Sequence, residues 1–104
     1  MKLEEGSSIV ADLTTVGRKT GQRRKVELRF IYYQKRFYAS SSRVAGKHWC
    51  QNLLKNPGVE LTVHGEQFSC TAKPVADETL RRHILTLRDP QSRMDRMVFE
   101  IRPE

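Results

Sequence analysis

The sequence lacks several features that would assign it to a well-defined class. No apolar run approaches the roughly 20 residues that a membrane-spanning helix needs, and the first residues do not resemble a secretory signal peptide. Only two cysteines occur, Cys50 and Cys70, and the three histidines are scattered without carboxylates at metal-ligand spacing. We therefore expect no membrane span, no metal site and no structural disulfide, and a cytoplasmic protein whose thiols are reduced.

Acidic residues are also scarce. The 104 residues include 12 Asp and Glu against 19 Lys and Arg, which gives a formal net charge of +7. Residues 17–29 contain six cationic side chains and one anionic side chain, so this segment alone carries +5. Such an excess favours an anionic partner: a nucleic acid, an anionic lipid or a polyanionic small molecule.

Two glycines, Gly17 and Gly21, lie in this basic segment. Because glycine tolerates positive φ angles, we expect the backbone N–H groups here to form an anion-binding concavity, with arginines that bind phosphate or carboxylate through two hydrogen bonds. The segment is not a P-loop, since it lacks the Gly-x-x-x-x-Gly-Lys-Ser/Thr spacing and a strand pattern follows it. A solvated hairpin loop is the alternative interpretation.

Apolar and polar residues alternate in several short segments, as is typical of strands with one buried face. The length suits one domain with a modest core, so we expect a single domain over residues 1–104. Turns are predicted at Gln34-Lys35-Arg36 and at His64-Gly65. The predicted strands are residues 8–15, 26–33, 37–41, 59–63, 68–72 and 97–102.

Two helices are predicted among these strands. Residues 47–56 form the first, with Trp49, Leu53 and Leu54 on its buried face. The second begins at the N-cap Asp77 and ends before Pro90. Five or six antiparallel strands with two helices predict a small, mainly antiparallel α+β barrel, whose closure would remove exposed strand edges.

Several motifs occur together at characteristic distances. They are Thr14-Thr15-Val16-Gly17-Arg18-Lys19-Thr20-Gly21-Gln22-Arg23-Arg24 followed by Leu28, then Ser41-Ser42-Arg43, then Trp49 with Asn52-Leu53 and Asn56-Pro57. Over residues 13–74 the sequence resembles the deazaflavin-dependent nitroreductase family. The resemblance implies an FMN-binding split-barrel-like fold. It also implies an oxidoreductase that binds reduced coenzyme F-420 and passes a hydride to an electrophilic acceptor, such as a quinone or a nitroaromatic compound.

The resemblance further implies which residues bind the coenzyme. Coenzyme F-420, an 8-hydroxy-5-deazaflavin, carries a phosphodiester and a glutamate tail, so it is an anion that a basic turn suits; FMN is the second choice. No catalytic residue is assigned, because the hydride chemistry belongs to the cofactor and the protein supplies binding and orientation. The implied cofactor-binding residues are Gly17, Arg18, Lys19, Thr20, Gly21, Arg24, Leu28, Ser41, Ser42, Arg43 and Trp49.

The sequence departs from the family mainly where the acceptor would bind. Cys50 replaces a tyrosine, and Val44-Ala45-Gly46 replaces a Gly-Gly loop. Because hydride transfer needs a closely positioned acceptor, these differences predict slow and unselective turnover.

A homodimer is also expected. In a barrel this small, Ile31, Tyr33 and Phe37 are expected to leave apolar strand surface open, and association is a common way to cover such surface. The resemblance adds that related split barrels place the cofactor at a subunit interface.

Two other functions remain open at this stage. A small basic barrel could bind nucleic acid, with residues 18–29 on phosphates and strand aromatics on bases. A flavin-binding relative without efficient catalysis is the other alternative. His48 lies beside the expected groove and is either a proton donor or an exposed residue at the start of a helix.

Overall fold

The computed structural model describes residues 3–42, 44–91 and 93–104, which form six strands, two α-helices and one short 3-10 helix. Every strand and helix expected from the sequence is present, with bounds that differ by at most three residues. In chain order they are β1 (Ser8–Val16), β2 (Arg23–Tyr33), β3 (Arg36–Ser41), η1 (Val44–Gly46), α1 (His48–Lys55), β4 (Gly58–Val63), β5 (Glu66–Pro74), α2 (Glu78–Arg88) and β6 (Met97–Pro103).

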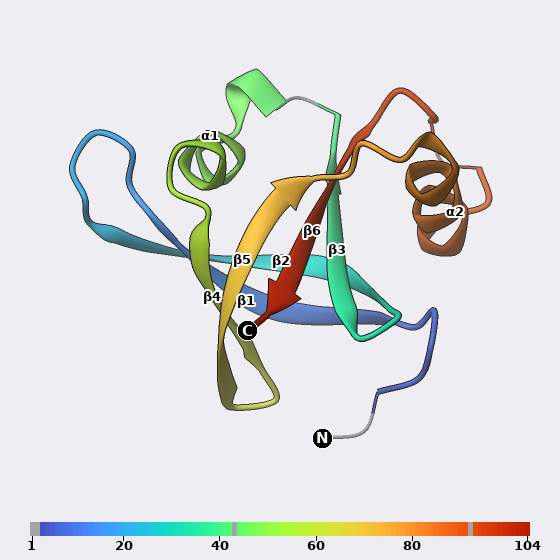
Figure 1. Ribbon diagram of the computed structural model, residues 1–104, viewed down its shortest axis with the longest axis horizontal. Coiled ribbons are helices and arrows are strands. Elements are labelled where there is room, and N and C mark those ends of the chain that lie inside the picture. Colours follow the sequence, from blue (N-terminus) through green and yellow to red (C-terminus); the bar gives the residue numbers. More distant parts are fainter. Residues whose placement is uncertain (1–2, 43, 92) are drawn as a thin grey trace.

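The six strands pair into a closed antiparallel barrel in the order β1-β2-β3-β6-β5-β4 (Figure 1). The last strand, β6, inserts between β3 and β5, so the barrel closes only when the end of the chain is in place. Each strand therefore has a neighbour on both sides, which protects the backbone donors and acceptors of the sheet. The predicted α+β barrel is confirmed.

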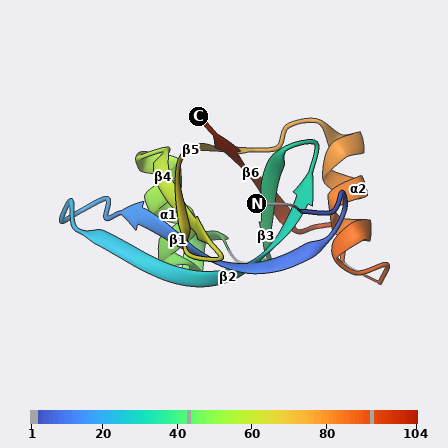
Figure 2. The same cartoon turned by 90° about the horizontal axis from the view of Figure 1, so that it is seen from below.

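The β1–β2 hairpin is long, and its tip extends beyond the barrel (Figures 1 and 2). The two strands stay in register from Ser8 opposite Ile31 to Val16 opposite Arg23. β1 also pairs with β4, but only over Asp12 to Thr14. The hairpin end is therefore two-stranded, and it carries the cationic segment away from the barrel body.

Two tight turns have positive φ at both central residues. They are Gln34-Lys35, with φ of 50° and 64°, and His64-Gly65, with φ of 51° and 82°. This combination belongs to the type I′ turn, whose twist matches that of paired antiparallel strands. Both turns lie where the sequence predicts them, except that Arg36 begins β3 rather than belonging to the turn.

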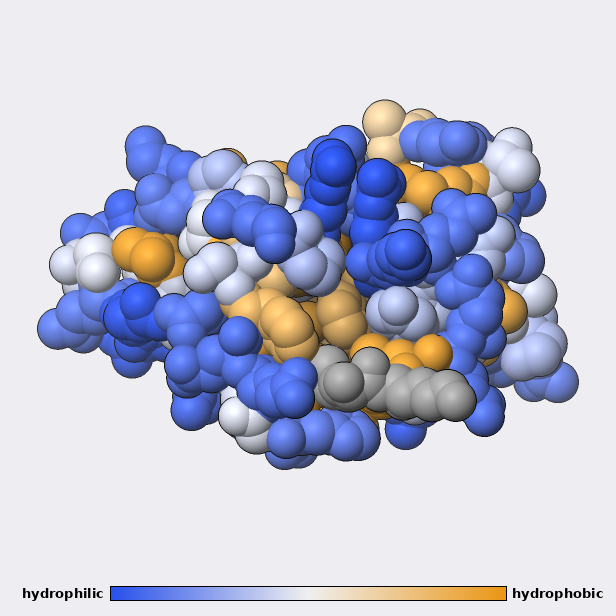
Figure 3. Space-filling model, turned by 60° about the horizontal axis from the view of Figure 1, so that its bottom comes forward, coloured by the Kyte–Doolittle hydropathy of each residue, from blue (hydrophilic) through white to orange (hydrophobic). Residues whose placement is uncertain are grey.

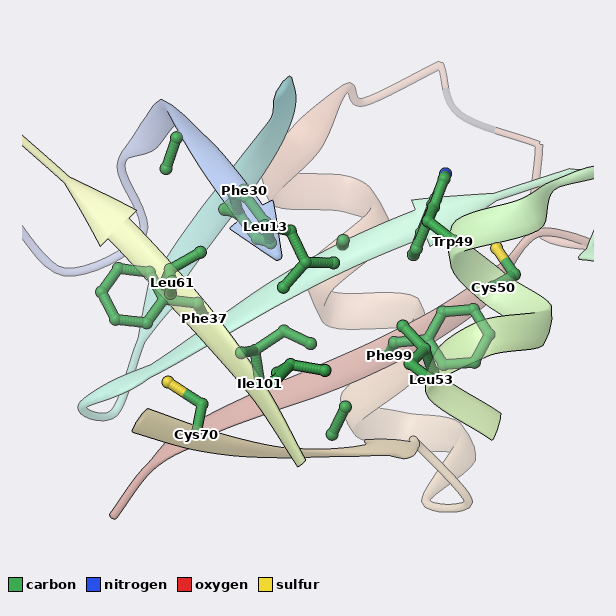
Figure 4. Packing of buried hydrophobic residues seen from close by; sticks show 14 of the residues in the cluster. Leu13, Phe30, Phe37, Trp49, Cys50, Leu53, Leu61, Cys70, Phe99 and Ile101 are labelled. Carbon is green, nitrogen blue, oxygen red and sulfur yellow. The ribbon is translucent and has the colours of Figure 1, made fainter. Parts of the chain in front are cut away.

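Apolar side chains from all six strands and from one side of α1 fill the barrel (Figure 4). Leu61 and Phe99 are completely buried. Trp49 and Leu53 attach α1 to this cluster, with the Trp49 ring edge-on to Phe99 at a centroid distance of 5.7 Å. The prediction that Leu54 is buried is wrong: it is 43% exposed, because it lies on the side of α1 that faces solvent.

The second helix, α2, covers the barrel from outside. The Asp77 side chain accepts hydrogen bonds from the N–H groups of Thr79 and Leu80 at 3.0 and 3.2 Å, which is the predicted N-cap. Ile84 and Leu85 are buried against β2, β3 and β6. No helix in the described part of the chain is long and apolar enough to cross a membrane.

The expected open surface at Ile31, Tyr33 and Phe37 is absent. Ile31 is only 2% exposed because α2 lies over it, and Phe37 is 3% exposed because it points into the barrel. Tyr33 is half-buried, and its ring packs against that of His83 with a distance of 5.0 Å between the ring centroids. The sequence pattern identifies these residues as apolar, but it does not show that a helix from later in the chain covers them.

An exposed apolar area lies at the lower end of the barrel. Figure 3 shows hydrophobic residues gathered at the centre of a largely hydrophilic face. A cavity of about 220 Å³ lies at this end of the barrel. Its lining comes from the N-terminal segment, the Gln34-Lys35 turn and the strands β2, β3, β5 and β6, and consists of Leu3, Tyr32, Lys35, Phe37, Glu66, Phe68 and Pro103.

Candidate functional site

A cavity of about 620 Å³ lies between the β1–β2 hairpin and the start of α1. This volume falls in the range of roughly 300–1,000 Å³ that is typical of small-molecule sites. Two segments far apart in the sequence form its walls. The lining residues are Thr15, Gly17, Arg18, Lys19, Thr20, Arg24, Lys25, Val26, Gly46, Lys47, His48, Trp49 and Asn52.

The lining is strongly cationic. Arg18, Lys19, Arg24, Lys25 and Lys47 all contribute to it, and no carboxylate among the described residues does so. Charges of one sign in a cleft add up to a field that concentrates an oppositely charged ligand. The cavity therefore suits a ligand with several negative charges.

The hairpin tip is fixed by hydrogen bonds within itself. The N–H of Gly17 donates to the carbonyl of Gln22 at 2.7 Å, and the N–H of Gly21 donates to the carbonyl of Gly17 at 2.9 Å. The N–H of Gln22 donates to Oγ1 of Thr20 at 3.2 Å. The predicted anion-binding concavity is therefore wrong for these three N–H groups, which are already used. The positive charge that would attract an anionic ligand comes instead from the cationic side chains that line the cavity.

The two glycines of the tip serve different purposes. Gly21 has φ of +72°, as the sequence predicts. Gly17 does not have a positive φ, and its role is to permit a close approach. A Cβ at this position would lie 2.8 Å from Oγ1 of Thr20 and 3.2 Å from the carbonyl oxygen of Gln22. A larger residue at position 17 would therefore push the tip open.

Asn52 connects α1 to the hairpin. Its side chain is buried, and its Oδ1 accepts hydrogen bonds from both the backbone N–H and the Nη1 of Arg18, at 3.1 and 2.9 Å. Its Nδ2 donates to Oγ1 of Thr15 at 3.3 Å. One turn later, Nδ2 of Asn56 donates to the carbonyl of Val16 at 3.3 Å. These bonds join the two walls of the cavity.

Six of the predicted cofactor-binding residues line the cavity: Gly17, Arg18, Lys19, Thr20, Arg24 and Trp49. Four others lie outside its lining. Leu28 packs half-buried on the barrel core, Ser41 is buried at the end of β3, and Gly21 and Ser42 are exposed. Arg43 lies outside the described residues. A role for these five residues in binding stays a prediction.

Several lining residues were not identified as site residues from the sequence. Val26 shares the inward strand face with Arg24, and Asn52 follows Trp49 by three residues on the helix, so strand and helix periodicity could have indicated both. Lys47 gave no signal beyond its charge. His48, a candidate proton donor, is exposed and lines the cavity.

Cys50 does not line the cavity and is completely buried. Burial raises the pKa of its thiol, although a hydrogen bond with Ser41 acts in the opposite direction, so the thiol is protonated at neutral pH. The cysteine that replaces the family's tyrosine therefore does not form part of this cavity wall. Slow turnover stays a prediction, but the replacement of tyrosine by Cys50 no longer supports it. In the described part of the chain, no three His, Cys, Asp or Glu residues are grouped as metal ligands.

Solved structures show the same fold. A putative pyridoxamine 5′-phosphate oxidase from Listeria innocua superimposes with a TM-score of 0.76 at 17% identity, covering 91% of this chain and 83% of that chain. An F420-H2-dependent reductase gives a TM-score of 0.69 at 23% identity, with 88% and 92% covered. A structure described as a domain-swapped dimer gives 0.71 at 24% identity, with 88% and 78% covered. The barrel therefore has the split-barrel fold expected from the sequence.

The family is identified by sequence. Residues 2–97 match the family described as F420H(2)-dependent quinone reductase, and because this match spans most of the chain, the protein belongs to that family. It is an oxidoreductase that depends on the reduced deazaflavin coenzyme F-420. The cofactor and the enzyme class predicted from the sequence are thereby confirmed. The residues present fit this coenzyme, since the cavity combines five cationic side chains with the apolar Val26 and Trp49.

Proposed function

We propose that the cavity between the β1–β2 hairpin and α1 binds coenzyme F-420 and that the acceptor is a small quinone or a similar electrophile. The observation that carries this proposal is a cavity lining that combines five cationic side chains with the apolar Val26 and Trp49 and has no carboxylate among the described residues. A phosphodiester with a glutamate tail matches the cationic side chains, and a flat ring matches the two apolar ones. When bound, the reduced coenzyme supplies the hydride.

The residues of this chain then have separate tasks. Arg18, Lys19, Arg24 and Lys25 would hold the anionic part of the coenzyme, because they form the hairpin side of the cavity. Trp49 is 8% exposed, so only part of its ring faces the cavity and the rest is fixed by the core. An immobile aromatic wall orients a flat ring at little entropic cost.

Trp49 is the only tryptophan in the chain, so its fluorescence reports on this cavity. We expect oxidised and reduced F-420 to quench it at lower concentrations than FMN does, because F-420 carries more negative charge towards the five cations. The measurement is an intrinsic-fluorescence titration at low salt, repeated in 0.5 M salt, where screening should weaken binding. Quenching by FMN alone, or none by either compound, would contradict the proposed site.

The acceptor is tested separately. Under anaerobic conditions, the protein loaded with reduced F-420 is mixed with a small benzoquinone or with a nitroaromatic compound, and the coenzyme absorbance is followed over a single turnover. If the natural acceptor is a quinone, bound F-420 should be oxidised faster by the benzoquinone than by the nitroaromatic compound. Equal rates with and without the protein would reject the quinone proposal while leaving the binding result intact.

We also propose that the protein is a homodimer. The cavity lining comes only from residues 15–26 and 46–52 within the described chain, so a second copy could cover its open side. One similar structure is described as a domain-swapped dimer, which supports the idea. Light scattering should give about twice the 12.1 kDa of one chain. A single-chain mass across micromolar concentrations would refute it.

We also propose that the protein is cytoplasmic. Its two cysteines, Cys50 and Cys70, are free and buried, which suits a compartment that keeps thiols reduced.

A further inference from the structure

We infer that Asn52 is a positioning residue that fixes the Arg18 guanidinium in the cavity while leaving its positive charge available to the coenzyme. The inference rests on the proposed binding of F-420 in this cavity. It assigns to a buried neutral amide a part in setting affinity and charge preference, beyond its part in joining α1 to the hairpin.

The geometry of the amide is the first argument. Oδ1 of Asn52 accepts from the backbone N–H of Arg18 at 3.1 Å and from its Nη1 at 2.9 Å. Both Arg18 groups are donors, so the atom that faces them must be the oxygen. Asn52 is 4% exposed and its Nδ2 donates to Oγ1 of Thr15 at 3.3 Å, so the amide itself cannot rotate freely. Arg18 is thereby tied at both ends of its side chain.

The second argument is the absence of a counter-charge. Some arginines of this chain are paired with carboxylates, such as Arg23 with Glu60, Arg36 with Glu100, and Arg81 with Glu78. Within the described residues Arg18 has no such ion pair. A guanidinium has five N–H donors, and one bond to Asn52 leaves the others for a ligand. An amide can therefore orient the group without neutralising it.

The consequence is preorganisation. A flexible arginine loses side-chain entropy when it binds a ligand, whereas one that is already fixed loses less. Fixing it with a carboxylate would remove the same entropy cost but would also cancel the charge that attracts the coenzyme. Asn52 provides the first effect without the second.

Asn52→Asp separates the two effects because the side chains have the same shape. The carboxylate can still accept both Arg18 bonds, and the Thr15 hydroxyl can turn to donate instead of accept. We expect the variant to fold, and to bind F-420 roughly tenfold more weakly, because one charge-assisted contact loses its net charge. Its affinity should also fall less steeply with salt than that of the unaltered protein.

Asn52→Ala removes the orientation and keeps the charge. We expect a similar loss, again roughly tenfold, but with the salt dependence of the unaltered protein. Lys55→Gln is the matched control: like Asn52→Asp it lowers the net charge by one, but at an exposed residue of α1 that does not line the cavity. Its affinity should stay within about twofold. Urea denaturation of each variant shows whether it remains folded at the assay temperature.

A deazaflavin that lacks the phosphodiester and the glutamate tail gives a second comparison. Its affinity should change little in Asn52→Asp, because the lost charge acts on the anionic part of F-420. In the unaltered, ligand-free protein, NMR of the arginine side chains should show slower rotation of the Arg18 guanidinium than of Arg24. This measurement tests the fixing of Arg18 even where a variant does not fold.

The outcomes are distinct. If the unaltered protein does not bind F-420, the proposed function fails first. If it binds F-420 but both Asn52 variants fold and bind it equally well, Asn52 is only a link between α1 and the hairpin and the inference is wrong. An Arg18 guanidinium as mobile as that of Arg24 would overturn it as well.

Discussion

Replacing both Arg18 and Lys19 by alanine should weaken F-420 binding by a factor of about 100 or more. Both side chains line the cationic wall of the cavity. A charge-assisted hydrogen bond contributes about 1.5–3 kcal/mol, and about 1.4 kcal/mol is a factor of ten, so two such contacts give this loss. The titration of Trp49 fluorescence measures it directly, since the reporter lies on the other wall of the same cavity.

The two residues should differ in their effect on stability. Lys19 is exposed, so Lys19→Ala should change the free energy of unfolding by less than about 0.5 kcal/mol. Arg18→Ala removes the Nη1 donor to Oδ1 of Asn52 but keeps the backbone N–H donor, so it should lower the free energy of unfolding by about 0.5–1.5 kcal/mol. The pair Arg29→Ala and Lys55→Ala is the charge-matched control, because neither residue lines the cavity. If this pair weakened binding as much, net charge would explain the loss and the assignment of Arg18 and Lys19 would fail.

Phe99→Ala should lower the free energy of unfolding by about 3–5 kcal/mol, the range for phenylalanine truncation in a core. Phe99 is completely buried on β6, opposite Ala39 of β3, and it supports Trp49 edge-on at 5.7 Å (Figure 4). Small domains are typically stable by about 5–15 kcal/mol, so this loss is a large fraction of the total. The measurement is urea denaturation followed by circular dichroism.

A local effect should accompany the global one. Without Phe99, the inner edge of Trp49 loses its support, so the tryptophan emission of the folded variant should shift towards that of a more hydrated ring. F-420 affinity should fall too, because Trp49 lines the cavity. Met97→Ala is the control on the same strand, since Met97 is 36% exposed. If Phe99→Ala lowered the free energy of unfolding by less than about 1.5 kcal/mol, the barrel would have collapsed into the cavity left by the ring, and the prediction would be wrong.

Local patterns in the sequence determined the elements of the fold. Alternation predicts β1 and β2, Asp77 predicts the start of α2, and His64-Gly65 predicts a hairpin turn; all are confirmed. Each depends on residues within a few positions of one another, so the sequence contains the whole signal. The misplaced Leu54 belongs to a short helix in which neighbouring leucines lie about 100° apart, and only packing decides which one is buried.

Sequence patterns indicate only one of the two walls of the candidate site clearly. The cationic turn is contiguous, so its charge is visible in the sequence, and six predicted residues line the cavity. The opposite wall begins at Gly46, 20 residues after Val26, and nothing local shows that Asn52 meets Arg18 across 34 positions. The wrong prediction of an anion-binding concavity at the tip has a different cause, because the N–H groups of Gly17 and Gly21 bond to carbonyls of the same loop, and the loop's conformation decides this.

The sequence by itself therefore determined the strands, the turns, the basic segment and, through its motifs, the family and the coenzyme. Only the tertiary structure decided that α2 covers Ile31, that Cys50 is buried outside the cavity, and that Asn52 fixes Arg18. The physical reason is the range of the interactions. Backbone preferences and side-chain periodicity act within a few residues, whereas burial and hydrogen-bond partners depend on which distant segments the closure of the barrel brings together.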